Sequence, residues 1–193
     1  MYKILKRILD FLASLLGSVV LLPVFLILAC LIKAESRGPV FFKQKRFGKN
    51  KKFFYIYKFR TMKTDTPKDV PTHLLSNPSR FITKTGRFLR RFSLDELPQI
   101  FNILKGDMSF VGPRPALWNQ EDLIALRDLG RCNSLTPGLT GLAQIKGRDE
   151  LPLEVKANYD NEYAEKMSLV FDMGIILKTA VKAVAGDGVK EGV

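Results

Sequence analysis

Two adjacent carboxylates, Asp95 and Glu96, stand within the stretch FSLDELPQIFNILKGDMSFVGPRP, residues 92–115. Adjacent residues of a helix project about 100° apart, so we expect the two side chains to have different roles. Arg90 and Arg91 lie nearby in the sequence and favour an ionised Asp95 at neutral pH. An ionised aspartate can bind Mg²⁺ through its oxygens, or it can attack phosphorus as a nucleophile.

The same pair also has a purely structural explanation. Ser93 with Glu96 three residues later matches a capping box, and acidic residues in a first turn favour the helix dipole. Asp95 is itself a good N-cap, which would place Pro98 at the third helical position, where its missing N–H costs little. Apolar residues at helical spacing then continue to a stop at Gly106. Both explanations predict that a helix starts at this pair.

Composition narrows the chemistry that the chain can support. The 193 residues suit one modest domain, and 31 Lys and Arg against 19 Asp and Glu imply an anionic partner, which can be nucleic acid, a membrane surface or a phosphorylated substrate. The single histidine, His73, argues against most histidine-built zinc sites and against a Ser-His-Asp arrangement. Two cysteines, Cys30 and Cys132, suggest no disulfide framework. Carboxylates, lysines, arginines and hydroxyls are left to do any chemistry.

An uncharged apolar run extends from Phe11 to Ile32, long enough as a helix of about 33 Å to cross a bilayer. Basic residues flank both of its ends, which makes both ends look cytoplasmic. Pro23 lies at its middle and predicts a kink near residues 19–23. A helix that dips into one leaflet and returns satisfies both flanks, and an ordinary kinked span is the alternative.

The remaining elements follow from periodicity and turn residues. We expect a β-hairpin over residues 38–62 with its turn near Gly48–Asn50, a loop over 63–79, a basic amphipathic helix over 81–92, a short helix over 120–129, and a helix over 154–184 with Leu169, Ile176, Ala180 and Val184 as an apolar stripe. The predicted fold is α+β, mainly helical with a short hairpin. We divide it into a membrane-anchoring helix-break-helix over residues 1–36, a catalytic domain over 37–185 and a flexible tail over 186–193.

The order of several motifs resembles that of the bacterial sugar transferases, the monotopic polyprenyl-phosphate phosphoglycosyl transferases. The motifs are YKFRTM (57–62), LRRFSLDELPQIFNILKGDMSFVGPRP (89–115), TPGLTGLAQIKGR (136–148) and YDNEYAEKMSLVFDMGIILKT (159–179), behind an apolar segment with a central proline. The chain looks like the small form of the family, similar to the enzyme that initiates bacterial N-linked glycans, because no multi-span region precedes these motifs.

The resemblance implies a role for individual residues. Asp95 matches the nucleophile, which attacks the β-phosphorus of a UDP-sugar, expels UMP and holds the sugar phosphate until polyprenyl phosphate collects it. Asp95 also matches the ligand of the Mg²⁺ cofactor, and Glu96 matches a second acid that assists the acceptor phosphate. Residues near the phosphates and nucleotide align with Lys58, Arg90, Pro113, Arg114, Pro115 and Arg148.

The resemblance also implies a location and a set of partners. We expect a re-entrant anchor and interfacial amphipathic helices at the bacterial inner membrane, the catalytic domain on its cytoplasmic face, and UDP-sugar, polyprenyl phosphate and membrane lipid as partners. Two residues depart from the family pattern. Leu22 stands where many relatives have Ser before the proline, and Leu153 follows Pro152 where many have Trp.

Three other functions compete with this one. A membrane-tethered nucleic-acid binder explains the aromatic and basic residues 41–59, yet no helix-turn-helix or RNP pattern is evident, and we expect no nucleic-acid partner. A non-catalytic membrane scaffold would keep the carboxylate pair only as a helix cap. A Mg²⁺-dependent hydrolase of nucleotide sugars would release free sugar phosphate without lipid.

Overall fold

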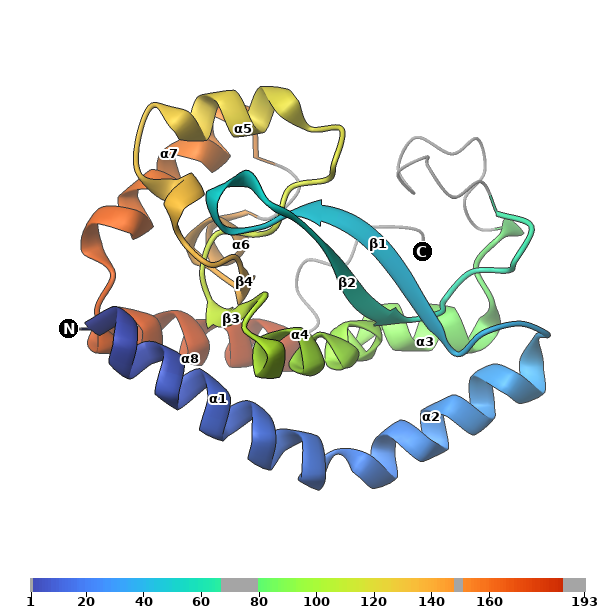
Figure 1. Cartoon of the computed structure of the whole chain (residues 1–193). Helices are drawn as coiled ribbons and strands as arrows, with labels where there is room; N and C mark the ends of the chain where they lie inside the picture. The colour runs from blue at the N-terminus through green and yellow to red at the C-terminus, as the bar shows by residue number, and fades with distance from the viewer. Residues whose placement is uncertain (1, 67–79, 148–150, 186–193) are drawn as a thin grey trace.

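The computed structural model describes residues 2–66, 80–147 and 151–185, and it is mainly helical with two small sheets (Figure 1). The α-helices are α1 (Tyr2–Val20), α2 (Leu22–Glu35), α3 (Lys84–Arg91), α4 (Ile100–Lys105), α5 (Glu121–Asp128), α6 (Leu142–Lys146), α7 (Leu153–Lys166) and α8 (Leu169–Ala185). The strands are β1 (Phe41–Phe47), β2 (Phe53–Phe59), β3 (Ser109–Val111) and β4 (Gly138–Thr140), and the short 3₁₀ helices are η1 (Lys49–Lys51), η4 (Leu94–Gln99) and η5 (Cys132–Ser134). This arrangement agrees with the α+β class that the sequence predicts.

The amino-terminal apolar run forms two helices that meet at Leu21 with a bend of 59° (Figure 1). Pro23 lies in the first turn of α2, where its missing N–H is tolerated, and its ring is incompatible with a straight helix continuing from Val19. The break thus falls where the sequence predicts it. Over the described residues no single helix is long and apolar enough to cross a membrane, whereas α1 and α2 together meet that test.

One face of α2 is part of the protein core. Phe25, Leu28 and Ile32 follow helical spacing and pack against Phe59 of β2 and Leu89 of α3. On the other face of the helix, Leu26 and Ile27 are each 60% exposed. The exposed face of α2 is therefore as apolar as its buried face, unlike that of an ordinary amphipathic surface helix.

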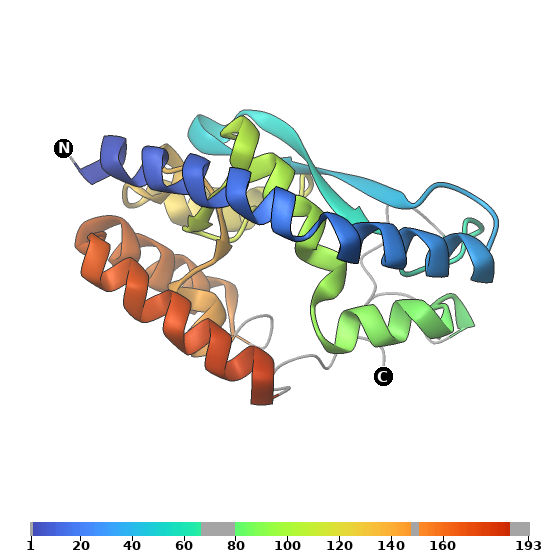
Figure 2. The same cartoon turned by 90° about the horizontal axis from the view of Figure 1, so that it is seen from below.

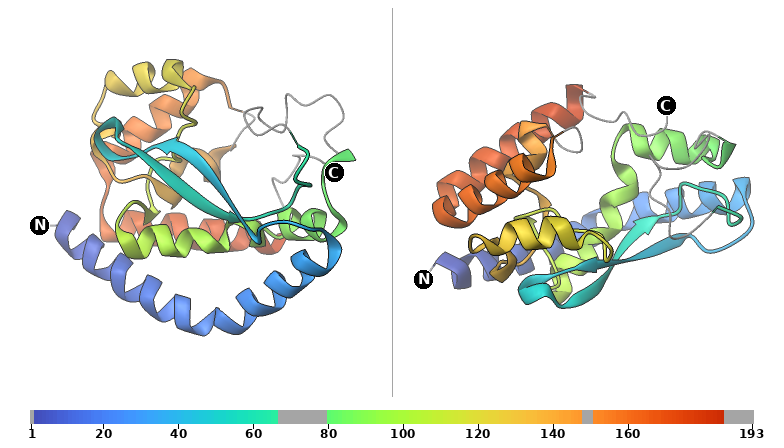
Figure 3. Two further views of the ribbon diagram at one scale, coloured as in Figure 1. Left: turned by 45° about the vertical axis from the view of Figure 1, so that its right-hand side comes forward. Right: turned by 90° about the horizontal axis from the view of Figure 1, so that it is seen from above.

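The predicted β-hairpin is present. β1 and β2 pair antiparallel, from Phe41 opposite Phe59 to Phe47 opposite Phe53. Its turn passes through η1, where Asn50 and Lys51 adopt the left-handed conformation that a tight reversal needs. The hairpin crosses the molecule between the α1–α2 pair and α5, and it carries Lys58 near the end of β2 (Figure 3).

The start of the helix at the carboxylate pair differs from the prediction. Residues 94–99 form the 3₁₀ helix η4, and α4 begins only at Ile100. Ser93 adopts a left-handed φ of 54° and its hydroxyl makes no capping hydrogen bond, so the predicted capping box is absent. The apolar residues of the predicted basic helix differ in their burial, since Leu89 is buried and Phe88 is half exposed.

The predicted carboxyl-terminal helix is two helices, α7 and α8. The chain turns at Met167, and the Ser168 hydroxyl then accepts a hydrogen bond from the Phe171 N–H at 3.2 Å, capping α8. Of the predicted apolar stripe, Leu169 and Ile176 are exposed, while Ile175 is the residue that enters the core. Figure 2 shows α8 beside α1 on the side of the molecule that also carries α2 and α3.

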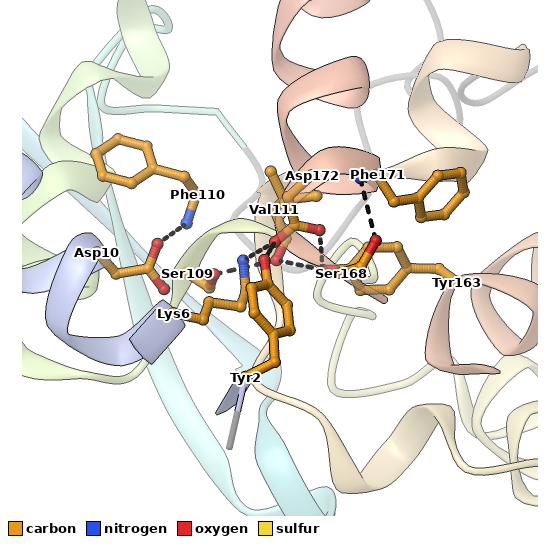
Figure 4. A network of polar contacts seen from close by, with 10 residues as sticks. All are labelled: Tyr2, Lys6, Asp10, Ser109, Phe110, Val111, Tyr163, Ser168, Phe171 and Asp172. Atoms are coloured by element: carbon orange, nitrogen blue, oxygen red, sulfur yellow. Dashed lines mark hydrogen bonds and ion pairs between the residues drawn. The ribbon is translucent and has the colours of Figure 1, made fainter. Parts of the chain in front are cut away.

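A buried polar network joins this last helix to the first (Figure 4). The carboxylate of Asp172 accepts hydrogen bonds from Tyr2 and Lys6 of α1, both at 2.5 Å, and from Tyr163 of α7 at 2.8 Å. Nearby, the Asp10 carboxylate accepts from the Phe110 N–H at 3.2 Å. The network holds α1 against the domain by specific contacts, in addition to apolar packing.

Candidate active site

Asp95 and Glu96 lie on η4, which is held in place from both sides of the pair. Leu94 and Leu97 pack against the core cluster that includes Phe25 and Ile100. This leaves Asp95 nearly buried, at 9% exposure. The backbone around the pair is thus fixed by apolar contacts, and the two carboxylates are free to interact with side chains from other elements.

Lys58 of β2 contacts both carboxylates. Its Nζ donates to Glu96 Oε1 at 2.8 Å and lies 3.8 Å from Asp95 Oδ2, which is too long for a hydrogen bond. Strand β2 is fixed to α4 by the fully buried Asn102, whose side chain accepts from the Tyr57 N–H at 3.0 Å and donates to the Tyr55 carbonyl at 2.8 Å. Asn102 therefore sets the position of Lys58 relative to η4.

Arg114 contacts the same oxygen of Glu96 as Lys58, with Nη2 3.2 Å from Oε1. Its loop is anchored at several backbone carbonyls. Arg127 donates to the Arg114 carbonyl at 3.0 Å and is itself held by buried Asp160, while Arg46 donates to the Pro115 carbonyl at 3.0 Å. These contacts hold the backbone of the loop from which Arg114 reaches Glu96.

A small parallel sheet supports the same loop. β3 and β4 pair so that Ser109 faces Gly138 and Val111 faces Thr140. A Cβ on Gly138 would come within 2.1 Å of the Gly112 nitrogen, so only glycine allows the two strands this close. The close pairing of these strands joins the GPRP motif to the TPGLTG motif, so the two motifs support each other in the structure.

The two carboxylates experience opposite electrostatic environments. Burial raises the pKa of Asp95, and Lys58, the principal cation opposing this, does not outweigh it. Burial also favours the neutral form of Glu96, but the charges and hydrogen bonds of Lys58 and Arg114 prevail and lower its pKa. Arg90 and Arg114 also act to lower the pKa of Asp95, but together with Lys58 they only partly offset the effect of burial. A pair with separated pKa values is suited to divided roles in catalysis.

A cavity of about 10 Å³ lies within this cluster, lined by Arg46, Ile56, Lys58, Glu96, Gln99, Arg114 and Pro115. Pockets for drug-sized ligands have volumes of roughly 300–1,000 Å³. A nucleotide sugar is therefore too large for the cavity, and a phosphorylated substrate would have to lie over the cluster.

The structure brings together most of the residues that the sequence predicts for the site. Lys58, Asp95, Glu96 and Arg114 form one contact group, with Pro113 and Pro115 on the same loop as Arg114. Arg90 donates to Thr61 at 3.0 Å, and its charge acts on Asp95. Arg148 lies outside the described residues. Within the described residues no group of three His, Cys, Asp or Glu side chains is arranged to hold a metal ion.

Sequence reasoning missed the residues that position this group. Asn102, Arg127 and Asp160 act through contacts between segments far apart in the chain, so spacing gives no indication of them. One signal was present, because Asn102 is a polar residue flanked by apolar ones on both sides in the helix IFNILK. A buried polar side chain in such a place usually has a hydrogen-bonding role.

Known proteins share these motifs over nearly the whole chain. Residues 1–186 match the model of the family described as bacterial sugar transferase. The chain is 39% identical to the uncharacterized sugar transferase EpsL of Bacillus subtilis (strain 168), covering 97% of this chain and 91% of the relative. It is 41% identical to the exopolysaccharide production protein PSS of Rhizobium leguminosarum bv. phaseoli, covering 92% and 94% respectively.

A third relative has a reaction in its name. This is the UDP-glucose:undecaprenyl-phosphate glucose-1-phosphate transferase of Xanthomonas campestris pv. campestris, at 38% identity. The match covers 94% of this chain but only 39% of the longer Xanthomonas protein. With a family match that spans almost every residue and includes the whole Asp95–Glu96 cluster, the chain belongs to the bacterial sugar transferase family.

Proposed function

We propose that this protein transfers a sugar 1-phosphate from a UDP-sugar to polyprenyl phosphate, yielding polyprenyl diphosphate sugar and UMP. The observation that carries the proposal is that the two neighbouring carboxylates have different contacts. Glu96 is occupied by Lys58 and Arg114, whereas Asp95 lies 3.8 Å from the lysine, beyond hydrogen-bonding distance. The reaction printed in the name of the Xanthomonas relative supports the same class of chemistry.

In the first step an oxygen of the ionised Asp95 carboxylate attacks the β-phosphorus of the donor. The bond between that phosphorus and the oxygen bridging to the α-phosphate breaks, and UMP leaves with the bridging oxygen. In the second step an oxygen of polyprenyl phosphate attacks the same phosphorus and releases the Asp95 carboxylate. Splitting the transfer in this way lets a water-soluble donor and a lipid-bound acceptor react in turn.

Lys58 and Arg114 are the cations placed to stabilise the transferring phosphoryl group. Without substrate both are engaged by Glu96. We propose that the donor diphosphate draws them away and stabilises its negative charge with them. Glu96, whose lowered pKa makes it a weak base while the cations are near, then regains basicity and assists the acceptor phosphate.

The carboxylate of Asp95 suits Mg²⁺ as an ion that the protein shares with the phosphates of the substrate. Magnesium commonly takes one or two protein carboxylates and completes its shell with substrate phosphate oxygens and water. Asp95 is the residue that would hold it, because its oxygens are not hydrogen-bonded to Lys58. When bound, the ion would neutralise charge on the diphosphate.

We further propose that α1 and α2 dip into the cytoplasmic leaflet of the inner membrane and return. The 59° bend and the apolar exposed faces of both helices support this over a straight span. Single cysteines introduced at Tyr2 and Lys33 of the full chain should both react with a membrane-impermeant thiol reagent only from the cytoplasmic side, after Cys30 is replaced by Ser. Labelling of the Tyr2 position from the periplasm would restore the kinked span.

The decisive experiment separates the two half-reactions. Full-length enzyme with Mg²⁺ is given a panel of UDP-sugars, beginning with UDP-glucose, without acceptor. We expect about one equivalent of UMP and a sugar-phosphate adduct on the peptide containing Asp95, discharged by polyprenyl phosphate. UMP release that requires both substrates, with no adduct, would overturn the covalent route. Continuous release of free sugar phosphate without lipid would indicate the hydrolase, and no turnover with any donor would favour the scaffold.

A further inference from the structure

A second and much larger cavity lies away from the carboxylate pair, between α6, α7 and α8. Its volume is about 450 Å³, and none of the residues that line it belongs to the Asp95–Glu96 cluster. Its wall is apolar along Phe171 and Ile175 of α8, and three lysines, Lys146, Lys166 and Lys178, surround it. We call it the α8 groove.

A glycine in the wall of the groove has no packing explanation. Gly174 lies in the middle of α8, and a Cβ added to it would meet nothing within 4 Å. Glycine inside a helix costs roughly 1 kcal/mol relative to alanine. No neighbouring residue comes close enough to force a glycine at this position. The space beside Gly174 is therefore available for a molecule that approaches the helix backbone.

The charge around the groove favours an anion. Lys166 is paired with Glu162 at 2.8 Å, and Glu162 is the one acidic residue among the described residues of the wall. Within the described part of the chain, neither Lys146 nor Lys178 has a carboxylate partner. As far as the described residues show, the groove therefore combines an apolar interior with two lysines, Lys146 and Lys178, that have no carboxylate partner.

The groove also opens beside an apolar surface. Val170 both lines the groove and is 82% exposed, and Leu177 and Val181 on the same helix are 63% and 69% exposed. In Figure 2, α1 and α8 approach each other near their amino-terminal ends and then diverge, and the outward residues of α1 are also apolar. A chain entering the groove from this side would come from a bilayer, and its phosphate would remain at the level of the lysines.

We propose that the α8 groove binds one anionic phospholipid, with an acyl chain against Phe171, Gly174 and Ile175 and the phosphodiester between Lys146 and Lys178. The polyprenyl phosphate acceptor has related chemistry. We assign the groove to the phospholipid because its wall shares no residue with the cluster where the acceptor must react. The inference does not depend on the transfer reaction, and its test contains no donor.

The test uses delipidated full-length protein in detergent and native mass spectrometry. Dioleoyl phosphatidylglycerol should bind at one molecule per chain, and dioleoyl phosphatidylcholine, with the same chains, at least tenfold more weakly. Lys146→Gln with Lys178→Gln should lower the affinity for phosphatidylglycerol about 30-fold. The matched control, Lys33→Gln with Lys182→Gln, removes the same charge outside the groove and should leave that affinity within twofold.

A second pair of variants tests the space itself. Gly174→Leu should fill the groove and weaken both lipids, whereas Gly174→Ala should raise the melting temperature and retain binding. Equal losses in the two double-lysine variants, or full binding by a folded Gly174→Leu protein, would overturn the proposal. Displacement of phosphatidylglycerol by an equimolar amount of polyprenyl phosphate would also overturn it, and would make the groove an acceptor site.

Discussion

Asp95 and Asp172 are both buried aspartates with a lysine beside them, yet their surroundings differ in one respect. Asp172 accepts hydrogen bonds from Tyr2, Lys6 and Tyr163, so its oxygens are satisfied. Asp95 has its lysine at 3.8 Å, and that lysine is hydrogen-bonded to Glu96 instead. Burial without a hydrogen bond from any of the described residues is costly for the Asp95 carboxylate, and it agrees with the reactive role that we propose for Asp95.

The two aspartates, the one that we propose to react and the one with a structural role, differ in the hydrogen bonds that their carboxylates accept. Identity and burial do not distinguish the two residues, which are 9% and 4% exposed. What differs is the neighbouring carboxylate. Glu96 competes with Asp95 for Lys58, whereas among the described residues no second carboxylate forms an ion pair with Lys6. A like-charged neighbour thus keeps Asp95 from being neutralised by its own ion pair.

The largest effect should come from Asp95→Asn, which removes the proposed nucleophile while keeping the size of the side chain. We expect the rate of UMP formation to fall at least about 10³-fold. The melting temperature should stay near that of the native protein, because no hydrogen bond to Lys58 is lost. Steady-state UMP assays and thermal unfolding in the same detergent measure both. Turnover near the native rate would remove Asp95 from the chemistry.

Asp172→Asn should have the opposite outcome. The variant leaves Lys6 buried without its counter-charge and disturbs the hydrogen bonds of Tyr2 and Tyr163, so stability should fall by about 3 kcal/mol. Activity per folded molecule, measured well below the melting transition, should remain within a few-fold of native. A loss of turnover as large as that of Asp95→Asn, in folded protein, would erase the distinction between the two aspartates.

The sequence could predict a structural feature when that feature is caused by residues close together in the chain. The hairpin turn at Gly48 and the break at Pro23 follow from the backbone preferences of one or two residues, and both are present. The carboxylate pair was found from a contiguous motif. Local rules were sufficient in each case because the competing interactions were weak.

The wrong predictions are those in which distant residues changed the local preference. Ser93 and Glu96 match a capping box, but Glu96 instead contacts Lys58, 38 residues away, and Arg114. The break between α7 and α8 has no Gly or Pro to mark it, and only the N-cap Ser168 signals it. The pairing of Arg127 with Asp160 spans 33 residues, so no spacing rule could indicate which arginine anchors the Arg114 loop.

Lys58→Met tests how the two carboxylates share one cation. The lysine lowers the pKa of both Asp95 and Glu96, so its removal should raise both. Since the ionised form of Asp95 is the one proposed to react, the acidic limb of the pH–rate profile should move to higher pH, and the rate at neutral pH should fall about 10²-fold. Lys58→Arg, which keeps the charge, should restore the position of the limb. An unmoved limb in Lys58→Met would show that the cation does not control Asp95.

The same substitution has a defined consequence for stability. Because Glu96 has a lowered pKa in the folded protein, its ion pairs stabilise the fold above the pKa of about 4.3 of an unfolded Glu, and this contribution is lost as the pH falls further. Lys58→Met should therefore reduce stability at pH 7 and flatten its decline in acid. Unfolding measured across pH 3 to 7 would detect the change.

The smallest effect concerns the turn before the pair. Ser93 has a φ of 54°, a conformation that costs a non-glycine residue about 1 kcal/mol, and its hydroxyl makes no capping hydrogen bond. Ser93→Gly should stabilise the protein by about 0.5 kcal/mol, since the greater freedom of the unfolded chain offsets part of the relief. Turnover should nevertheless fall two- to threefold, because a freer backbone holds Asp95 less firmly. Ser93→Ala keeps the strain and should match the native protein in both measurements; if it shows the same loss of turnover as Ser93→Gly, the hydroxyl rather than the backbone positions Asp95.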